Sequence, residues 1–184
     1  ILGDNIFYGQ MQLQHVVGDF DHGGLIFGYY VTDPTRYGVV EFDHDNNVLG
    51  IEEKPQAPKS NYAVPGFYIY DRNVVDVCRA LTPSARGELE ITDLNMAYLE
   101  QGRLKVNILG RGVAWLDTGT PESMLDAANF IATIQRRQGL RVACLEEVAM
   151  HMRFIDRDHL QALLAAMPDC NYRAYLLHRF GITA

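Results

Sequence analysis

One stretch of the chain restricts the possible folds more than any other. Residues 25–31 are almost all apolar or aromatic and lack the alternating polar residues of a strand with one face in water. A strand with this pattern is covered on both faces, as in sheets that lie between layers of helices. The stretch therefore favours an α/β fold.

The spacing of apolar residues divides the chain into a strand-rich first part and a helical remainder. Further strands are expected at about residues 38–42, 48–52, 62–70, 104–109 and 113–116. A short helix is expected at residues 7–17. From Asn73 onward the helical spacing i, i+3, i+4, i+7 predicts amphipathic helices at about 74–81, 90–101, 121–139, 145–152, 156–167 and 172–180. Asn73, Thr120 and Asp156 are candidate helix caps.

The composition argues against several classes of function. The formal net charge of −7, without a basic stripe, argues against binding to nucleic acids or anionic membranes. The three cysteines lack CxxC spacing and the six histidines lack an HExxH pattern, so neither a disulfide framework nor a zinc site is expected. No signal sequence and no apolar run of about 18 residues is visible, and we expect a soluble cytoplasmic protein.

The first residues of the chain read as the interior of a longer protein. Ile1, Leu2, Gly3 and Asp4 have the pattern of the end of a buried strand, without an initial methionine. We therefore expect that an upstream part is missing. Its loss would leave the Leu2 strand and residues 25–31 with a bare apolar edge, which promotes aggregation. The isolated chain is accordingly expected to be insoluble or oligomeric.

Charged side chains stand where three strands are expected to end. Asp4 and Asp117 each follow a short apolar run, at the position where strand ends of an α/β sheet open into a cleft. Glu53 and Lys54 form a third polar end. This set suits Mg²⁺ and phosphate groups, because Mg²⁺ prefers oxygen ligands and usually takes one or two protein carboxylates. An isolated aspartate at a strand end is more often a turn former or helix cap, so that alternative stays open.

Five motifs occur in order along the chain: LGDNIFYG at 2–9, RYGVVEF at 36–42, EEKP at 52–55, ARGELEITD at 85–93 and WLDTGT at 115–120. Through them nearly the whole chain resembles the glucose-1-phosphate thymidylyltransferases, sugar-nucleotide pyrophosphorylases that make dTDP-glucose. The resemblance implies an α/β fold, the C-terminal part of a three-layer α/β/α nucleotide-diphospho-sugar transferase fold with a mixed sheet. Residues 1–139 would be an incomplete nucleotidyltransferase domain with the sugar and metal sites, and residues 140–184 a helical C-terminal extension.

The resemblance also implies roles for individual residues. Asp4 and Asp117 match the family's two metal-binding aspartates, and with Lys54 they are the predicted catalytic residues. The predicted substrate-binding residues are Tyr37, Gly38, Glu53, Lys54, Val64, Arg86 and Trp115. Glu53 would accept hydrogen bonds from glucose hydroxyls, and Lys54 would lie near the sugar's phosphate. In a regular strand neighbouring side chains point to opposite faces, so only one of Glu52 and Glu53 can serve the pocket.

The implied reaction joins dTTP and glucose 1-phosphate into dTDP-glucose and diphosphate with Mg²⁺ as cofactor, and it feeds deoxysugar synthesis, especially that of rhamnose. The family is typically a homotetramer. Its glycine-rich nucleotide loop belongs upstream of Leu2 and is absent, so we expect little or no activity from this chain alone. Two alternatives stay open: a related transferase that uses UTP or CTP, and a non-catalytic sugar-phosphate-binding subunit.

Overall fold

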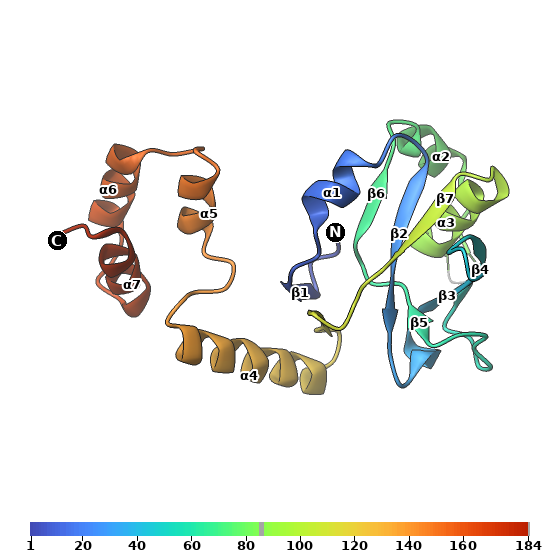
Figure 1. Ribbon diagram of the computed structural model, residues 1–184, viewed down its shortest axis with the longest axis horizontal. Coiled ribbons are helices and arrows are strands. Elements are labelled where there is room, and N and C mark those ends of the chain that lie inside the picture. Colours follow the sequence, from blue (N-terminus) through green and yellow to red (C-terminus); the bar gives the residue numbers. More distant parts are fainter. Residues whose placement is uncertain (85–86, 184) are drawn as a thin grey trace. The chain divides into compact units, whose positions relative to one another are not determined.

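The computed structural model describes residues 1–84 and 87–183 (Figure 1). The chain forms two compact units, Ile1–Ala127 and Ala128–Ala184. The boundary between the units lies within helix α4 (Pro121–Gln138). The division predicted from the sequence, after residue 139, lies just past the end of this helix. The α/β fold class is confirmed, because strands and helices mix in the first unit and helices make up the second.

The described residues of the first unit form a six-stranded mixed sheet around β2. Its order is β4-β3-β5-β2-β6, and β7 pairs with β2 as well. The strands are β2 (Gly24–Tyr30), β3 (Gly38–Phe42), β4 (Val48–Glu53), β5 (Tyr62–Ala63), β6 (Tyr68–Tyr70) and β7 (Leu104–Ile108). β2 pairs antiparallel with β6 and parallel with β7. The predicted bare edge at residues 25–31 is therefore wrong, because β2 has a partner on each side.

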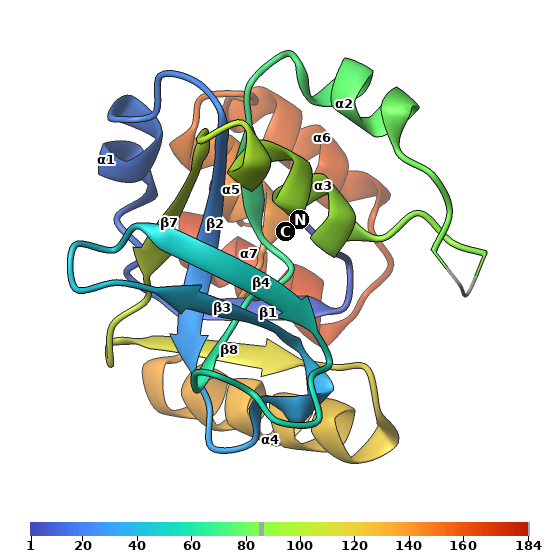
Figure 2. The ribbon, with the colours of Figure 1, turned by 90° about the vertical axis from the view of Figure 1, so that its right-hand side faces the viewer.

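Both faces of β2 are covered, as its continuous apolar pattern predicts. Ile26 is fully buried in a core that contains Val40, Leu94 and Tyr98. Phe27, also fully buried, points into a second core with Leu109 and Val113. Two helices, α2 (Val74–Ala80) and α3 (Ile91–Glu100), are neighbours (Figure 2). Both supply apolar side chains to the first core.

A two-stranded antiparallel ribbon lies beside the second core. It pairs β1 (Asn5–Gly9) with β8 (Val113–Asp117). The predicted helix at residues 7–17 is therefore wrong in its first half, and α1 comprises only Leu13–Gly18. Phe7, Met11 and Val16 all pack against the same core, from a strand, a loop and a helix respectively.

The start of the chain also differs from the prediction. Ile1 and Leu2 are outside any strand and are 74% and 47% exposed, so there is no buried strand at Leu2. Asp4 stands immediately before β1, whereas Asp117 is the last residue of β8, as predicted. Because β1 and β8 are antiparallel, the beginning of β1 and the end of β8 lie at the same end of the ribbon.

Asp71 connects four parts of the first unit at the end of β6. Its carboxylate accepts hydrogen bonds from the backbone N–H groups of Gly23 at 2.8 Å and Asn73 at 3.0 Å. The hydroxyl of Tyr98 donates to it at 3.0 Å, and the guanidinium of Arg103 pairs with it. The side chain is only 10% exposed, so these contacts replace most of its hydration.

The second unit is a small helical assembly. Its helices beyond α4 are α5 (Leu145–His151), α6 (Arg157–Ala166) and α7 (Asn171–Phe180). They pack around Cys144, Leu160, Leu164 and Leu176. Two predicted caps are confirmed: Thr120 Oγ1 accepts from Ser123 N at 3.1 Å, and Asp156 accepts from His159 N at 2.9 Å. The third, Asn73, precedes α2 but its side chain makes no capping hydrogen bond. In the described part of the chain, no helix has the length and apolarity needed to cross a membrane.

Candidate active site

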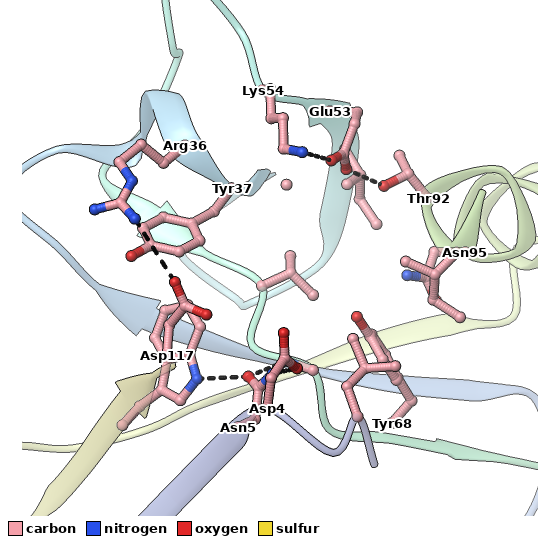
Figure 3. Close-up of a pocket in the computed structure, with 17 residues that line it drawn as sticks. Asp4, Asn5, Arg36, Tyr37, Glu53, Lys54, Tyr68, Thr92, Asn95 and Asp117 are labelled. Carbon is pink, nitrogen blue, oxygen red and sulfur yellow. Dashed lines mark hydrogen bonds and ion pairs between the residues drawn. The ribbon is translucent and has the colours of Figure 1, made fainter. Parts of the chain in front are cut away.

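A pocket of about 280 Å³ opens where the β1–β8 ribbon, the β3–β4 hairpin and the first turn of α3 converge (Figure 3). Eight of the nine site residues predicted from the sequence line it: Asp4, Tyr37, Gly38, Glu53, Lys54, Val64, Trp115 and Asp117. The ninth, Arg86, lies outside the described residues. These eight come from segments spread over more than a hundred residues, and the fold brings them to one place.

The two aspartates are neighbours at one end of the β1–β8 ribbon, Asp4 just before β1 and Asp117 at the end of β8. Cα of Asn5 is opposite that of Asp117, and Thr118 donates both its backbone N–H and its hydroxyl to the Asp4 carbonyl oxygen at 2.9 Å. Asp117 Oδ1 accepts from Gly119 N at 3.1 Å, and Arg36 Nη2 lies 3.8 Å from Asp117 Oδ2. Two carboxylates therefore face one pocket, and a guanidinium lies beside one of them.

Asn5 joins the Asp4 carboxylate to the wall of the pocket. Its Oδ1 accepts from the indole N–H of Trp115 at 2.6 Å and from Gly66 N at 3.0 Å, while its Nδ2 donates to Asp4 Oδ1 at 2.8 Å. Indole and backbone N–H groups can only donate, so the amide oxygen must face them and the amide nitrogen must face Asp4. Gly66 makes room for this arrangement, because a Cβ there would lie 2.8 Å from Asn5 Nδ2.

Replacing Asn5 with alanine is expected to lower the free energy of unfolding by about 1–3 kcal/mol, because Trp115 and Gly66 lose their common acceptor. Urea denaturation followed by tryptophan fluorescence and circular dichroism measures the change. Asn129→Ala, on the exposed surface of α4, is the matched control and should alter the free energy by less than about 0.5 kcal/mol. Equal losses in the two variants would contradict the role given to Asn5.

Glu53 and Lys54 reach the same pocket although they are adjacent in the chain. Glu53 lines the pocket and Glu52 lies in a hollow with Glu41 and Lys59, as the alternation of a strand predicts. The same alternation would direct Lys54 away with Glu52. Instead Lys54 has φ of +45°, just past the end of β4, and its Nζ lies 3.9 Å from Glu53 Oε1. A non-glycine residue rarely adopts this conformation, and at functional sites such strain often positions a side chain.

Aromatic rings and backbone groups form the rest of the wall. The rings of Tyr37 and Trp115 lie 5.0 Å apart between centroids, and the guanidinium of Arg36 lies 5.7 Å from the Tyr37 ring. Val64 N donates to Gly38 O at 2.8 Å, which places both residues beside Glu53. Trp115 thus packs against a neighbouring ring and also borders the pocket.

Five further polar residues line the pocket and were not singled out in the sequence: Asn5, Arg36, Tyr68, Thr92 and Asn95. Asn5, Arg36 and Thr92 lie within the motifs at 2–9, 36–42 and 85–93, and this membership could have identified them as site residues. Tyr68 and Asn95 lie within β6 and α3 and carried no signal distinct from ordinary packing. Burial raises the pKa of Tyr68 to about 12, helped by the charges of Glu53 and Asp4, so its hydroxyl stays protonated at neutral pH.

Comparison with known proteins places the chain in a family. The model of the nucleotidyl transferase family matches residues 1–134. Over 183 residues the chain is 52% identical to glucose-1-phosphate thymidylyltransferase of Neisseria gonorrhoeae, covering 98% of this chain and 64% of the relative. The protein of the same name from Mycobacterium tuberculosis strain CDC 1551 is 53% identical over 179 residues, covering 96% of this chain and 62% of the relative. The chain thus spans a little under two thirds of the length of these relatives.

Solved structures agree at the level of the fold. A Bacillus anthracis protein crystallised in complex with sucrose superposes with a TM-score of 0.63 at 41% identity, over 71% of this chain and 52% of that one. A UDP-glucose pyrophosphorylase with bound UDP-glucose has the same TM-score at 20% identity, over 72% of this chain and 55% of the other, and this likeness concerns the fold alone. On the family match, the fold and the motifs together, the chain belongs to the nucleotidyl transferase family.

Proposed function

We propose that this protein is a thymidylyltransferase that joins dTTP and glucose 1-phosphate into dTDP-glucose and diphosphate. The observation that carries the proposal is the pocket, in which two aspartates, a glutamate and a lysine from distant segments face one another. The identity of just over one half to proteins of that name supports the choice of nucleotide and sugar.

The chemistry proposed for the pocket is a direct displacement. A phosphate oxygen of glucose 1-phosphate attacks the α-phosphorus of dTTP, a new P–O bond forms, and diphosphate leaves with the electrons of the broken bond. No side chain has to form a covalent intermediate, so the contribution of the protein is alignment and charge. Lys54 would neutralise the phosphate of the sugar, and Arg36 is a second cation at the same pocket.

Mg²⁺ is the cofactor that we propose, and the donor set fits it. Asp4, just before β1, and Asp117, at the end of β8, provide carboxylate oxygens, and Mg²⁺ usually takes one or two carboxylates and completes its shell with phosphate oxygens and water. Within residues 1–84 and 87–183, no group of three or more His, Cys, Asp or Glu side chains could hold a metal ion by itself. When bound, Mg²⁺ would stabilise negative charge on the phosphate oxygens.

Recognition of the sugar is assigned to the opposite side of the pocket. The Glu53 carboxylate can accept hydrogen bonds from hydroxyl groups, and the Gly38–Val64 backbone pair borders it. The pocket volume of about 280 Å³ lies near the lower end of the range for small-ligand sites. A hexose phosphate is therefore a suitable occupant, with its phosphate directed toward Lys54.

Two neighbouring glutamates allow a matched test of this proposal. The chain should bind glucose 1-phosphate in isothermal titration calorimetry, and Glu53→Gln should weaken the binding about tenfold or more, because a hydrogen bond to a charged acceptor contributes about 1.5–3 kcal/mol. Glu52→Gln, on the opposite face of β4, should leave the affinity unchanged. If the unsubstituted chain shows no binding, or the two variants bind equally, the proposed sugar site is wrong.

A further inference from the structure

Glu53 has a hydrogen-bond partner outside its own strand. Thr92 Oγ1 donates to Glu53 Oε2 at 2.6 Å, and Lys54 Nζ lies 3.9 Å from the other carboxylate oxygen (Figure 3). Thr92 is 8% exposed and lies in the first turn of α3, so its position is set by the packing of that helix. The carboxylate therefore lies between a rigid hydroxyl and a more exposed ammonium group.

The Thr92 hydroxyl bonds outside its own helix. Thr92 is the second residue of α3, so no helical turn precedes it to offer a carbonyl, and the hydroxyl instead donates across to β4. The distance is that of a strong hydrogen bond between a hydroxyl and an ionised carboxylate. Gly38 leaves space for the pair, since a Cβ there would lie 3.2 Å from Glu53 Oε2 and 3.6 Å from Thr92 Oγ1.

We propose that Thr92 is a positioning residue that holds the Glu53 carboxylate in the orientation that accepts the hydroxyl groups of the sugar. This inference rests on the proposed function of the pocket. A glutamate side chain has several rotamers, and without the hydroxyl the Glu53 carboxylate is free to turn toward Lys54. That rotation would remove the acceptor from the sugar and would also engage the cation assigned to the sugar's phosphate.

The test compares Thr92→Val, which removes the hydroxyl and keeps the shape, with Thr92→Ser, which keeps the hydroxyl. Isothermal titration calorimetry with glucose 1-phosphate should show about fivefold to tenfold weaker binding for the valine variant and a change below twofold for the serine variant. In the Glu53→Gln background, Thr92→Val should add less than a twofold loss, because its effect passes through the carboxylate. Thermal unfolding verifies that each variant is folded, and Thr92→Ala provides a second hydroxyl-free variant should valine not fold.

Any of the following results would overturn the inference. Unchanged binding by the hydroxyl-free variants would show that Glu53 needs no such support. Equal losses with valine and serine would indicate a packing role for the methyl group, and a full additional loss in the Glu53→Gln background would show an effect independent of the carboxylate. Failure of the unsubstituted chain to bind glucose 1-phosphate would reject the proposed function itself, and this inference with it.

Discussion

Asparagine in place of Asp117 is expected to lower nucleotidyl transfer by about a hundredfold or more, the cost typical of losing one element of charge stabilisation at a reacting phosphate or carbonyl group. The amide keeps the size of the side chain and the bond from Gly119 N, but it removes the negative charge proposed to hold Mg²⁺ beside Asp4. Release of diphosphate at saturating substrate measures the effect. If the chain alone has little turnover, as the sequence predicts, loss of Mn²⁺ affinity in electron paramagnetic resonance measures the same change.

Asp126→Asn is a suitable control for this substitution. Asp126 lies on the exposed surface of α4, outside the residues that line the pocket, and the same change of carboxylate to amide should leave turnover and Mn²⁺ affinity unaltered. Retention of more than about a tenth of the activity by the Asp117 variant would contradict the assignment of this residue as a metal ligand, because a required ligand cannot be replaced at so small a cost.

Asparagine in place of Asp71 is expected to lower the free energy of unfolding by about 3 kcal/mol at pH 7. The change removes the charge that pairs with Arg103 and leaves an amide among donors that need acceptors, and loss of one member of a largely buried pair typically costs about 3–5 kcal/mol. Urea denaturation measures the loss. Asp76→Asn, in a pair with Arg79 in which Asp76 is 82% exposed, should cost less than about 1 kcal/mol.

The Asp71 contribution should also depend on pH in a defined direction. The hydrogen bond from Gly23 N–H, followed by those from Tyr98 and Asn73 and the charge of Arg103, holds the pKa of Asp71 below its ordinary value of 3.8. Because the folded-state pKa is the lower one, the contribution is fully present above the ordinary value and is lost as the pH falls through the folded-state pKa. Unfolding free energies measured between pH 6 and pH 2 should converge for the original and Asp71→Asn proteins. A constant difference would contradict the assignment.

The local spacing of apolar residues was sufficient to predict many of the strands and helices. The unbroken apolar run predicted a strand covered on both faces, and β2 has Ile26 in one core and Phe27 in the other. The helices beyond Asn73 were predicted because an amphipathic helix repeats its apolar contacts every three or four residues. The helix predicted at residues 7–17 failed in its first half, where Phe7, Met11 and Val16 contact one core from a strand, a loop and a short helix.

The candidate site was predicted as a set of residues and not as a geometry. Ordered motifs identified Asp4, Glu53, Lys54 and Asp117, and the pocket contains all four. Their arrangement was not predictable, because Asp4 was expected at the end of a strand and stands before one. Lys54 reaches the pocket through a positive φ that its residue type disfavours, so no local rule indicates it.

The sequence by itself determined the fold class, the positions of most helices and the identity of the charged residues, because these depend on residue type and spacing along a few turns or strands. Only the tertiary structure decided which other side chains hydrogen-bond to the residues of the pocket. Asn5 meets Trp115 across 110 residues, and Thr92 meets Glu53 across 39. Such pairs form only when strand register and helix packing bring distant segments within about 3 Å, a long-range condition that no local pattern records.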